Sequence, residues 1–139
     1  MAICHGVSFH RRSAVTGTSI LLTIEKDLVE QVVDIARRAG DAIMTIYATD
    51  FAIDTKDDRS PVTAADQAAE DVILAAIETQ IARAIPVVSE EAASVGQIPV
   101  VDEKPFWLVD PMDGTKEFIN HNGEFTVNIA LIEQHTPIL

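Results

Sequence analysis

Two acidic clusters follow apolar runs that have the character of β-strands. Glu90 comes directly after residues 86–89, and Asp110 and Asp113 come at the end of a run that begins at residues 106–109. In open α/β sheets, ligands collect beyond the carboxyl ends of the strands, so we expect these side chains to meet at one edge. Carboxylates are the hard oxygen ligands that Mg²⁺ prefers. The pattern therefore predicts a magnesium site built on Glu90, Asp110 and Asp113.

The segment that follows Asp110 could bring a cation and a phosphate together. Pro111 fixes φ, so we expect the backbone to turn immediately after Asp110 and to swing Asp113 toward the same cation. The backbone carbonyl of Met112 would point into that space. A conformation open only to glycine, followed by a helix start, would aim two amides at a phosphate. These amides belong to Gly114 and Thr115.

Phosphoester hydrolysis is the reaction that suits such a site. Two cations held roughly 3.5 to 4 Å apart clamp a phosphate, lower the pKa of a bound water and stabilise the leaving oxygen. Taken singly, the pair Glu90-Glu91 is typical of a solvated surface, and Asp-Pro and Asp-Gly are typical of turns. Their combination with Asp66 at an expected helix start favours the catalytic interpretation.

The composition of the chain limits the classes of partner and the cellular compartments that we expect. The 139 residues carry 22 acidic and 10 basic side chains, a formal charge of −12, which disfavours binding to a nucleic-acid polymer. A single cysteine, Cys4, predicts a reducing compartment and no internal disulfide. No apolar run approaches the roughly 20 residues of a membrane span. Residues 1–26 are too polar for a secretory signal and are interpreted as a disordered leader.

Apolar periodicity predicts two helices that could position these groups. One begins at Asp27, where Glu30 has capping-box spacing, and continues for about five turns. The second is expected to begin with Thr63 as its N-cap and to end before Pro86. The buried face of the second helix should hold Ala69, Val72, Ile73, Ala76, Ile77 and Ile81.

Several apolar runs have strand character, at residues 86–89, 106–109 and 125–132, and a shorter alternating run at 51–55 predicts another strand. Residues 125–132 are apolar on both faces, so we expect a strand covered on both sides. After a turn at 133–136, residues 137–139 resume as a hairpin partner would, and the domain is expected to continue beyond them. The predicted fold class is α/β (α+β), with helices packed on a sheet and Trp107 in the core.

These motifs resemble the inositol monophosphatase superfamily. Its pattern is an upstream Asp, then Glu-Glu, then Asp-Pro-(Ile/Leu)-Asp-Gly-Thr and a late Trp-Asp. The matching positions are Asp66, Glu90-Glu91 and residues 110–115, where Met112 replaces the usual Ile or Leu. Within the superfamily, four segments are similar to the 3′(2′),5′-bisphosphate nucleotidase (CysQ) branch: residues 60–66, 88–91, 113–119 and 123–132. The resemblance runs from about Leu28 to Leu139.

The resemblance implies a layered α/β/α/β/α fold, of which residues 27–139 would form the N-terminal part. It implies two or three Mg²⁺ ions bound by Glu90, Asp110, Asp113 and the Met112 carbonyl. It makes Asp66, Thr115 and Glu90 catalytic, with Asp66 and Thr115 orienting and deprotonating the attacking water. The implied substrate contacts are Glu90, Met112, Asp113, Gly114 and Thr115.

The implied reaction converts adenosine 3′,5′-bisphosphate to AMP and phosphate, in sulfur metabolism, with inhibition by lithium. An inositol monophosphatase or a fructose-1,6-bisphosphatase of the same superfamily is the first alternative. Because the late Trp-Asp has no counterpart before Leu139, a truncated relative that only binds metal is the second. For the isolated chain this predicts weak metal binding and little turnover.

Spacing argues against a phosphatase of the haloacid-dehalogenase type, whose nucleophile and acid lie two residues apart. Asp110 and Asp113 lie three apart. The expected partner is a small phosphorylated nucleotide and the expected location is the cytoplasm, with peripheral attachment to the inner membrane as an alternative. The oligomeric state stays open.

Overall fold

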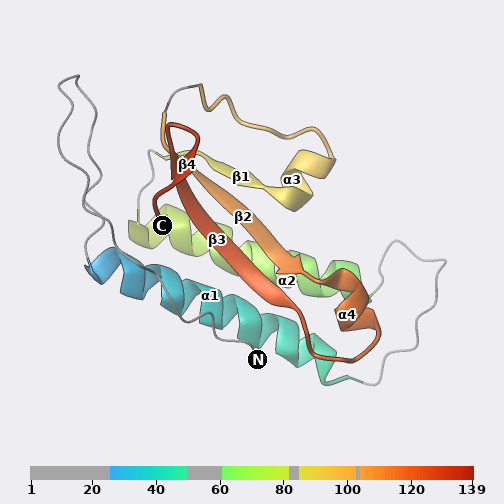
Figure 1. Ribbon diagram of the computed structural model, residues 1–139. Coiled ribbons are helices and arrows are strands. Elements are labelled where there is room, and N and C mark those ends of the chain that lie inside the picture. Colours follow the sequence, from blue (N-terminus) through green and yellow to red (C-terminus); the bar gives the residue numbers. More distant parts are fainter. Residues whose placement is uncertain (1–25, 50–60, 82–84, 103) are drawn as a thin grey trace.

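A computed structural model describes residues 26–49, 61–81, 85–102 and 104–139. Two long helices come first, α1 (Lys26–Tyr47) and α2 (Pro61–Ala76), and a π-helical turn, η1 (Ile77–Ile81), extends α2. The remaining elements are β1 (Val87–Ser89), α3 (Glu90–Ser94), β2 (Phe106–Asp113), α4 (Thr115–Ile119), β3 (Thr126–Glu133) and β4 (Thr136–Pro137). The predicted α/β class with helices packed on a sheet is therefore confirmed (Figure 1).

The four strands form one mixed sheet in the order β1-β2-β3-β4. β1 and β2 are parallel, whereas β2 with β3 and β3 with β4 are antiparallel. The turn between β3 and β4 places Gln134 and His135 at φ angles of 49° and 60°. Two successive residues with positive φ are the geometry of a tight hairpin turn. The predicted hairpin partner of residues 125–132 is thus present.

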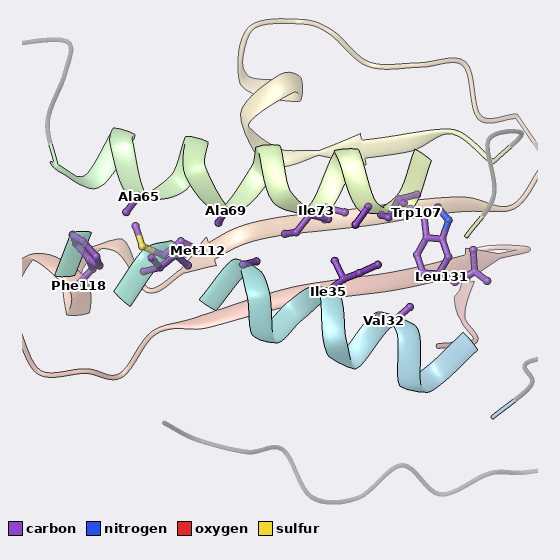
Figure 2. Packing of buried hydrophobic residues seen from close by; sticks show 14 residues of the cluster. Val32, Ile35, Ala65, Ala69, Ile73, Trp107, Met112, Phe118 and Leu131 are labelled. Carbon is purple, nitrogen blue, oxygen red and sulfur yellow. The ribbon is translucent and has the colours of Figure 1, made fainter. Parts of the chain in front are cut away.

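The hydrophobic core lies between the two long helices and one face of the sheet. Helix α1 packs on α2 and β3, and α2 also packs on β2. Figure 2 shows Ile35 and Ile73 pointing from the helices toward Trp107 and Leu131 on the strands. All four of these side chains are fully buried. Trp107 is therefore a core residue, as its place in an apolar run predicts.

The other face of the sheet is open in the described part of the chain. Leu108 on this face is 45% exposed, and Asn128 on β3 is also exposed. Within the described residues, the prediction that residues 125–132 are covered on both sides is therefore wrong. The alternation of buried Trp107 and Val109 with exposed Leu108 is instead that of a sheet covered on one side.

The helix starts differ from the sequence-based expectations. Helix α1 begins at Lys26, so Asp27 lies inside the helix, and Glu30 forms an exposed ion pair with Lys26 at 3.1 Å. Helix α2 begins at residue 61, which places Thr63 within its first turn rather than at its N-cap. The buried face predicted for α2 is present. The predicted strand at 51–55 and the leader, apart from its last residue, lie outside the described residues.

Among the described helices, none combines the length and the apolar character that a bilayer crossing requires.

Candidate functional site

Glu90 and Asp110 directly follow two residues that are paired between the parallel strands β1 and β2. Ser89, the last residue of β1, lies opposite Val109 in the register of β1 and β2. The residue after Ser89 is Glu90, which begins α3. The residue after Val109 is Asp110, which continues β2. The structure brings these two side chains together, so that one carboxyl group, when protonated, can donate a hydrogen bond to the other.

A β-bulge places Asp113 on the same side of the sheet as Asp110. The expectation that the backbone turns immediately after Asp110 is wrong, because β2 continues through Asp113. Asp110 pairs with Asn128 and Asp113 pairs with Thr126, so three steps along β2 oppose two along β3. Residues three apart in a regular strand point to opposite faces. The extra residue restores the two carboxylates to one face.

One oxygen of Asp110 is buried and has no hydrogen-bond partner in the described part of the chain. This atom is Oδ1, and the carboxylate also accepts a hydrogen bond from the backbone N–H of Met112. Burial raises the pKa of Asp110 to about 6, with further contributions from the charge and hydrogen bond of Glu90 and the charge of Asp113. An unpartnered buried carboxylate oxygen is costly unless a cation neutralises it.

Asp66 faces the same acidic group from helix α2. Its residue is 9% exposed. Burial, followed in order by the charges of Glu91, Asp110, Glu90 and Glu70, raises its pKa to about 7. At neutral pH this carboxyl group is close to half protonated. The structure therefore gathers acidic residues from α2, α3 and β2 within electrostatic range of one another.

Gly114 and Thr115 follow this acidic group and begin a short helix. Gly114 has φ 100°, in the region that favours glycine, and is the N-cap of α4. A Cβ at this position would lie 3.0 Å from the Glu124 carbonyl oxygen and 3.1 Å from Phe125. Both the conformation and the close approach therefore require glycine. Thr115 is the first residue of α4 and is exposed.

An aromatic cluster anchors α4 to the first helix. Phe118 of α4 is fully buried, with its ring centroid 5.2 Å from Tyr47 and 5.5 Å from Phe125. Tyr47 is the last residue of α1 and also lies 4.9 Å from the ring of His121. The core thus fixes the backbone that follows Asp113, since tilted and edge-on aromatic pairs hold a defined geometry.

The donor set suits Mg²⁺ by its chemistry, because Glu90, Asp110 and Asp113 offer hard oxygen ligands and Asp110 has an unpartnered oxygen. The side chains do not yet converge. In the residues that the structure describes, no three His, Cys, Asp or Glu side chains stand in an arrangement that could hold a metal ion. Glu90 already lies beside Asp110, and Asp113 is exposed, so its side chain can turn toward that pair without disturbing the core. Cation binding would require that rearrangement.

The short helix α3 and the two residues that stabilise its start, Ser89 and Glu70, were not predicted from the sequence. Ser89 is its N-cap and accepts a hydrogen bond from the Ala92 N–H at 3.3 Å. The Ser89 hydroxyl donates to Glu70, a buried carboxylate on α2. A serine directly before two glutamates is a helix-start signal, and Glu70 follows Asp66 by one helical turn. The first signal would have identified Ser89 as a cap, and the second would have placed Glu70 on the helix face of Asp66, whereas the contact between Glu70 and Ser89 depends on packing.

A hollow of about 390 Å³ lies beside Asp110 on the open face of the sheet. Its other lining residues come from β2 and β3: Leu108, Val127, Asn128, Ile129 and Ala130. A smaller cavity of about 120 Å³ lies at Phe106 and His135, at the opposite end of β2 from Asp113. Of these two hollows, the larger adjoins the acidic group.

Curated relatives resemble most of the described chain. The 3′(2′),5′-bisphosphate nucleotidase CysQ of Salmonella typhimurium is 54% identical over 114 residues, which cover 81% of this chain and 46% of the relative. The CysQ of Escherichia coli K12 is 50% identical over the same shares. The chain therefore spans less than half the length of these relatives.

Solved structures of similar proteins share the fold. CysQ from Bacteroides thetaiotaomicron superimposes with a TM-score of 0.65 at 38% identity, covering 83% of this chain and 41% of the other. An inositol monophosphatase from Zymomonas mobilis gives a TM-score of 0.68 at 32% identity, covering 84% and 43%. The sequence profile of the inositol monophosphatase family matches residues 25–139. The chain belongs to the inositol monophosphatase family, whose members are generally metal-dependent.

Proposed function

We propose that the protein carrying this sequence is a magnesium-dependent phosphomonoesterase that converts adenosine 3′,5′-bisphosphate to AMP and phosphate. The observation that carries the proposal is the buried, unpartnered Oδ1 of Asp110 among other carboxylates. Such an arrangement is unfavourable in the metal-free chain and becomes favourable around a divalent cation. The substrate is supported by the names of the CysQ relatives at 50–54% identity.

The proposed cation ligands are the side chains of Glu90, Asp110 and Asp113 and the carbonyl oxygen of Met112, which together would hold two or three Mg²⁺ ions. Bound Mg²⁺ supplies Lewis-acid polarisation of the phosphate and neutralises its charge. The bulge in β2 supports this ligand set, because it puts Asp110 and Asp113 on one face. Without cations, the formal charge of −12 would repel a phosphorylated substrate.

Asp66 and Thr115 are proposed to orient the attacking water and remove its proton, and Glu90 is included with them in the catalytic set. Burial and neighbouring carboxylates raise the pKa of Asp66 to about 7 in the metal-free chain, and bound cations would favour its ionised form, which can accept a proton. Thr115 is exposed at the start of α4, where its hydroxyl is accessible to water.

The substrate is proposed to contact Glu90, Met112, Asp113, Gly114 and Thr115. The Gly114 conformation supports this set, because the backbone there packs against Phe125 and fixes the direction of the following amides. Helix α4 has only five residues, so the individual N–H groups rather than a helix dipole would bind a phosphate oxygen. Lithium inhibition and a cytoplasmic location belong to the same proposal.

The test joins residues 25–139 to the remainder of the Salmonella relative, in place of its matching segment, because this chain covers 46% of that protein. Phosphate release is measured with adenosine 3′,5′-bisphosphate, inositol 1-phosphate and fructose 1,6-bisphosphate, with and without Mg²⁺ and LiCl. We expect the bisphosphate nucleotide to be preferred and Asp113→Asn to abolish turnover, with Glu78→Gln as the exposed control. Preference for inositol 1-phosphate would favour the alternative suggested by the Zymomonas likeness.

The 139-residue chain alone is proposed to bind Mg²⁺ weakly and to release little phosphate. Robust phosphate release by the chain alone would show that its own residues complete the site. Asp113→Asn removes a proposed cation ligand. Full activity of this chimera would therefore contradict the assignment of Asp113 to the cation site.

A further inference from the structure

Glu70 is a buried carboxylate that touches the start of α3. It lies on α2, is 6% exposed, and accepts hydrogen bonds from the Ser89 hydroxyl and from the backbone N–H of Ala92. Its second oxygen lies 3.4 Å from Gln67 Nε2, an interaction within the same helix. Glu70 therefore bridges the second helix and the end of β1.

Ser89 transmits this contact to Glu90. The Ser89 hydroxyl donates its proton to Glu70, which leaves lone pairs of Oγ to accept from the Ala92 N–H at 3.3 Å. The same serine is the N-cap of α3, and Glu90 is the first residue of that helix. The carboxylate of Glu70 thus orients the helix cap, and this cap determines the direction in which the Glu90 side chain projects from the backbone.

A carboxylate is an unfavourable choice for a purely structural contact here. Glu70 is buried beside the apolar face of α2 that holds Ala69 and Ile73. Replacing a buried charged contact with packed apolar side chains is often neutral or stabilising. Asp66 lies one helical turn before Glu70 on the same helix face. Through its contact with Ser89, Glu70 therefore connects the helix that carries Asp66 to the segment that carries Glu90.

We infer that Glu70 is a positioning residue, which fixes the distance and orientation of Glu90 relative to Asp66 through the Ser89 cap. The inference rests on the proposed function, since it assigns Glu70 a role in arranging that site. Glu70 itself touches neither cation nor substrate in this account.

The first measurement is amide hydrogen exchange of Ala92 by NMR in the 139-residue chain without metal. Glu70→Ala should accelerate this exchange roughly fivefold, because it removes both an acceptor of the Ala92 N–H and the group that orients the Ser89 cap. Glu70→Gln keeps an acceptor for the Ser89 hydroxyl and should restore slow exchange. Glu78→Ala removes a like charge from an exposed position on η1 and should leave exchange unchanged.

The second measurement is Mn²⁺ affinity by electron paramagnetic resonance, with Mn²⁺ as a paramagnetic substitute for Mg²⁺. Loss of a residue that orients a metal ligand typically weakens affinity about 10- to 100-fold. We expect a loss in this range for Glu70→Ala, recovery in Glu70→Gln, and no change in Glu78→Ala. Ser89→Ala breaks the same contact from its other side and should reproduce the loss if Glu70→Ala does not fold.

Normal Ala92 exchange in both Glu70→Ala and Ser89→Ala would overturn the inference. Faster exchange with unchanged Mn²⁺ affinity would also overturn it, because Glu70 would then support only α3. Failure of the unmodified chain to bind Mn²⁺ is a different result: it contradicts the proposed function and removes the positioning role with it. Weakened affinity together with rescue by glutamine supports the inference.

Discussion

The two halves of α2 lie in opposite environments. The C-terminal half, with Ile73, packs on Trp107 in the dry core (Figure 2). The N-terminal half carries Asp66 and Glu70, whose neighbours include the carboxylates of Glu91 and other acidic residues. One half therefore gains stability by excluding water, while the other accumulates like charges that destabilise the metal-free fold.

This difference indicates that the core holds the acidic end together against its own repulsion. The helices and strands extend continuously from the core into the acidic group, so the backbone there is placed by packing (Figure 1). Substitutions in the core should cost stability without regard to charge. Substitutions in the acidic group should change stability with the opposite sign.

Truncating the core should have the largest effect. Ile73→Ala removes a fully buried side chain between α2 and the sheet, which should destabilise the chain by about 2–5 kcal/mol. Urea unfolding followed by circular dichroism measures the loss, with exposed Val33→Ala as the control, expected within about 0.5 kcal/mol. Equal effects of the two substitutions would mean that the described core is wrong.

Lowering the pH should stabilise the metal-free chain. The pKa of Asp66 is about 7 in the folded chain, above its ordinary value of 3.8, so the folded state binds the proton more tightly. This contribution is fully present below about pH 4 and is lost as the pH rises through about 7, a change on the order of 2–4 kcal/mol. Thermal unfolding between pH 5 and 8 measures it, and Asp66→Asn should flatten the dependence. A melting temperature that rises as the pH increases from 5 to 8 would contradict the expectation.

Adding a methyl group at Gly114 should disturb the junction between the two regions. Gly114→Ala must hold φ near 100° with its Cβ 3.0 Å from the Glu124 carbonyl, which should cost about 1–3 kcal/mol. Gly40→Ala is the control, because a Cβ there meets nothing within 4 Å and alanine favours a helix. Similar unfolding midpoints for both variants would show that this turn is not restricted to glycine.

Removing one acidic charge should have the smallest effect and the opposite sign. Asp110→Asn keeps the shape but ends the repulsion by Glu90 and Asp113, so the metal-free chain should become more stable by about 1 kcal/mol at pH 8. The same urea experiment measures the change. Destabilisation would mean that the ionised carboxylate of Asp110 stabilises the metal-free fold.

Periodicity and motif spacing could predict the helices, the pattern of buried residues along α2, and the placement of Glu90 beyond β1. They could not predict the bulge, because the pairing of Asp110 with Asn128 and of Asp113 with Thr126 depends on β3. The fixed φ of Pro111 predicts a turn, whereas β2 continues through Pro111 and pairs with β3 again at Asp113. A local rule was overridden by a neighbouring strand.

The role of Glu70 was hidden for a similar reason. Within its helix it is one glutamate in an apolar pattern, and only the packing of α2 near α3 brings it to Ser89. The open face of the sheet was also not predictable, since the apolar pattern of residues 125–132 does not reveal which covering elements this chain contains. Long-range contacts determine both features.

The most direct test of the account is calorimetric titration of Mg²⁺ into the metal-free 139-residue chain at pH 7.5. We expect saturable, weak binding that is lost in Asp110→Asn and retained in Asp102→Asn, since Asp102 is an exposed aspartate outside the acidic group. The absence of binding to the unmodified chain, or equal binding by Asp110→Asn, would contradict the claim that these carboxylates gather to hold a divalent cation.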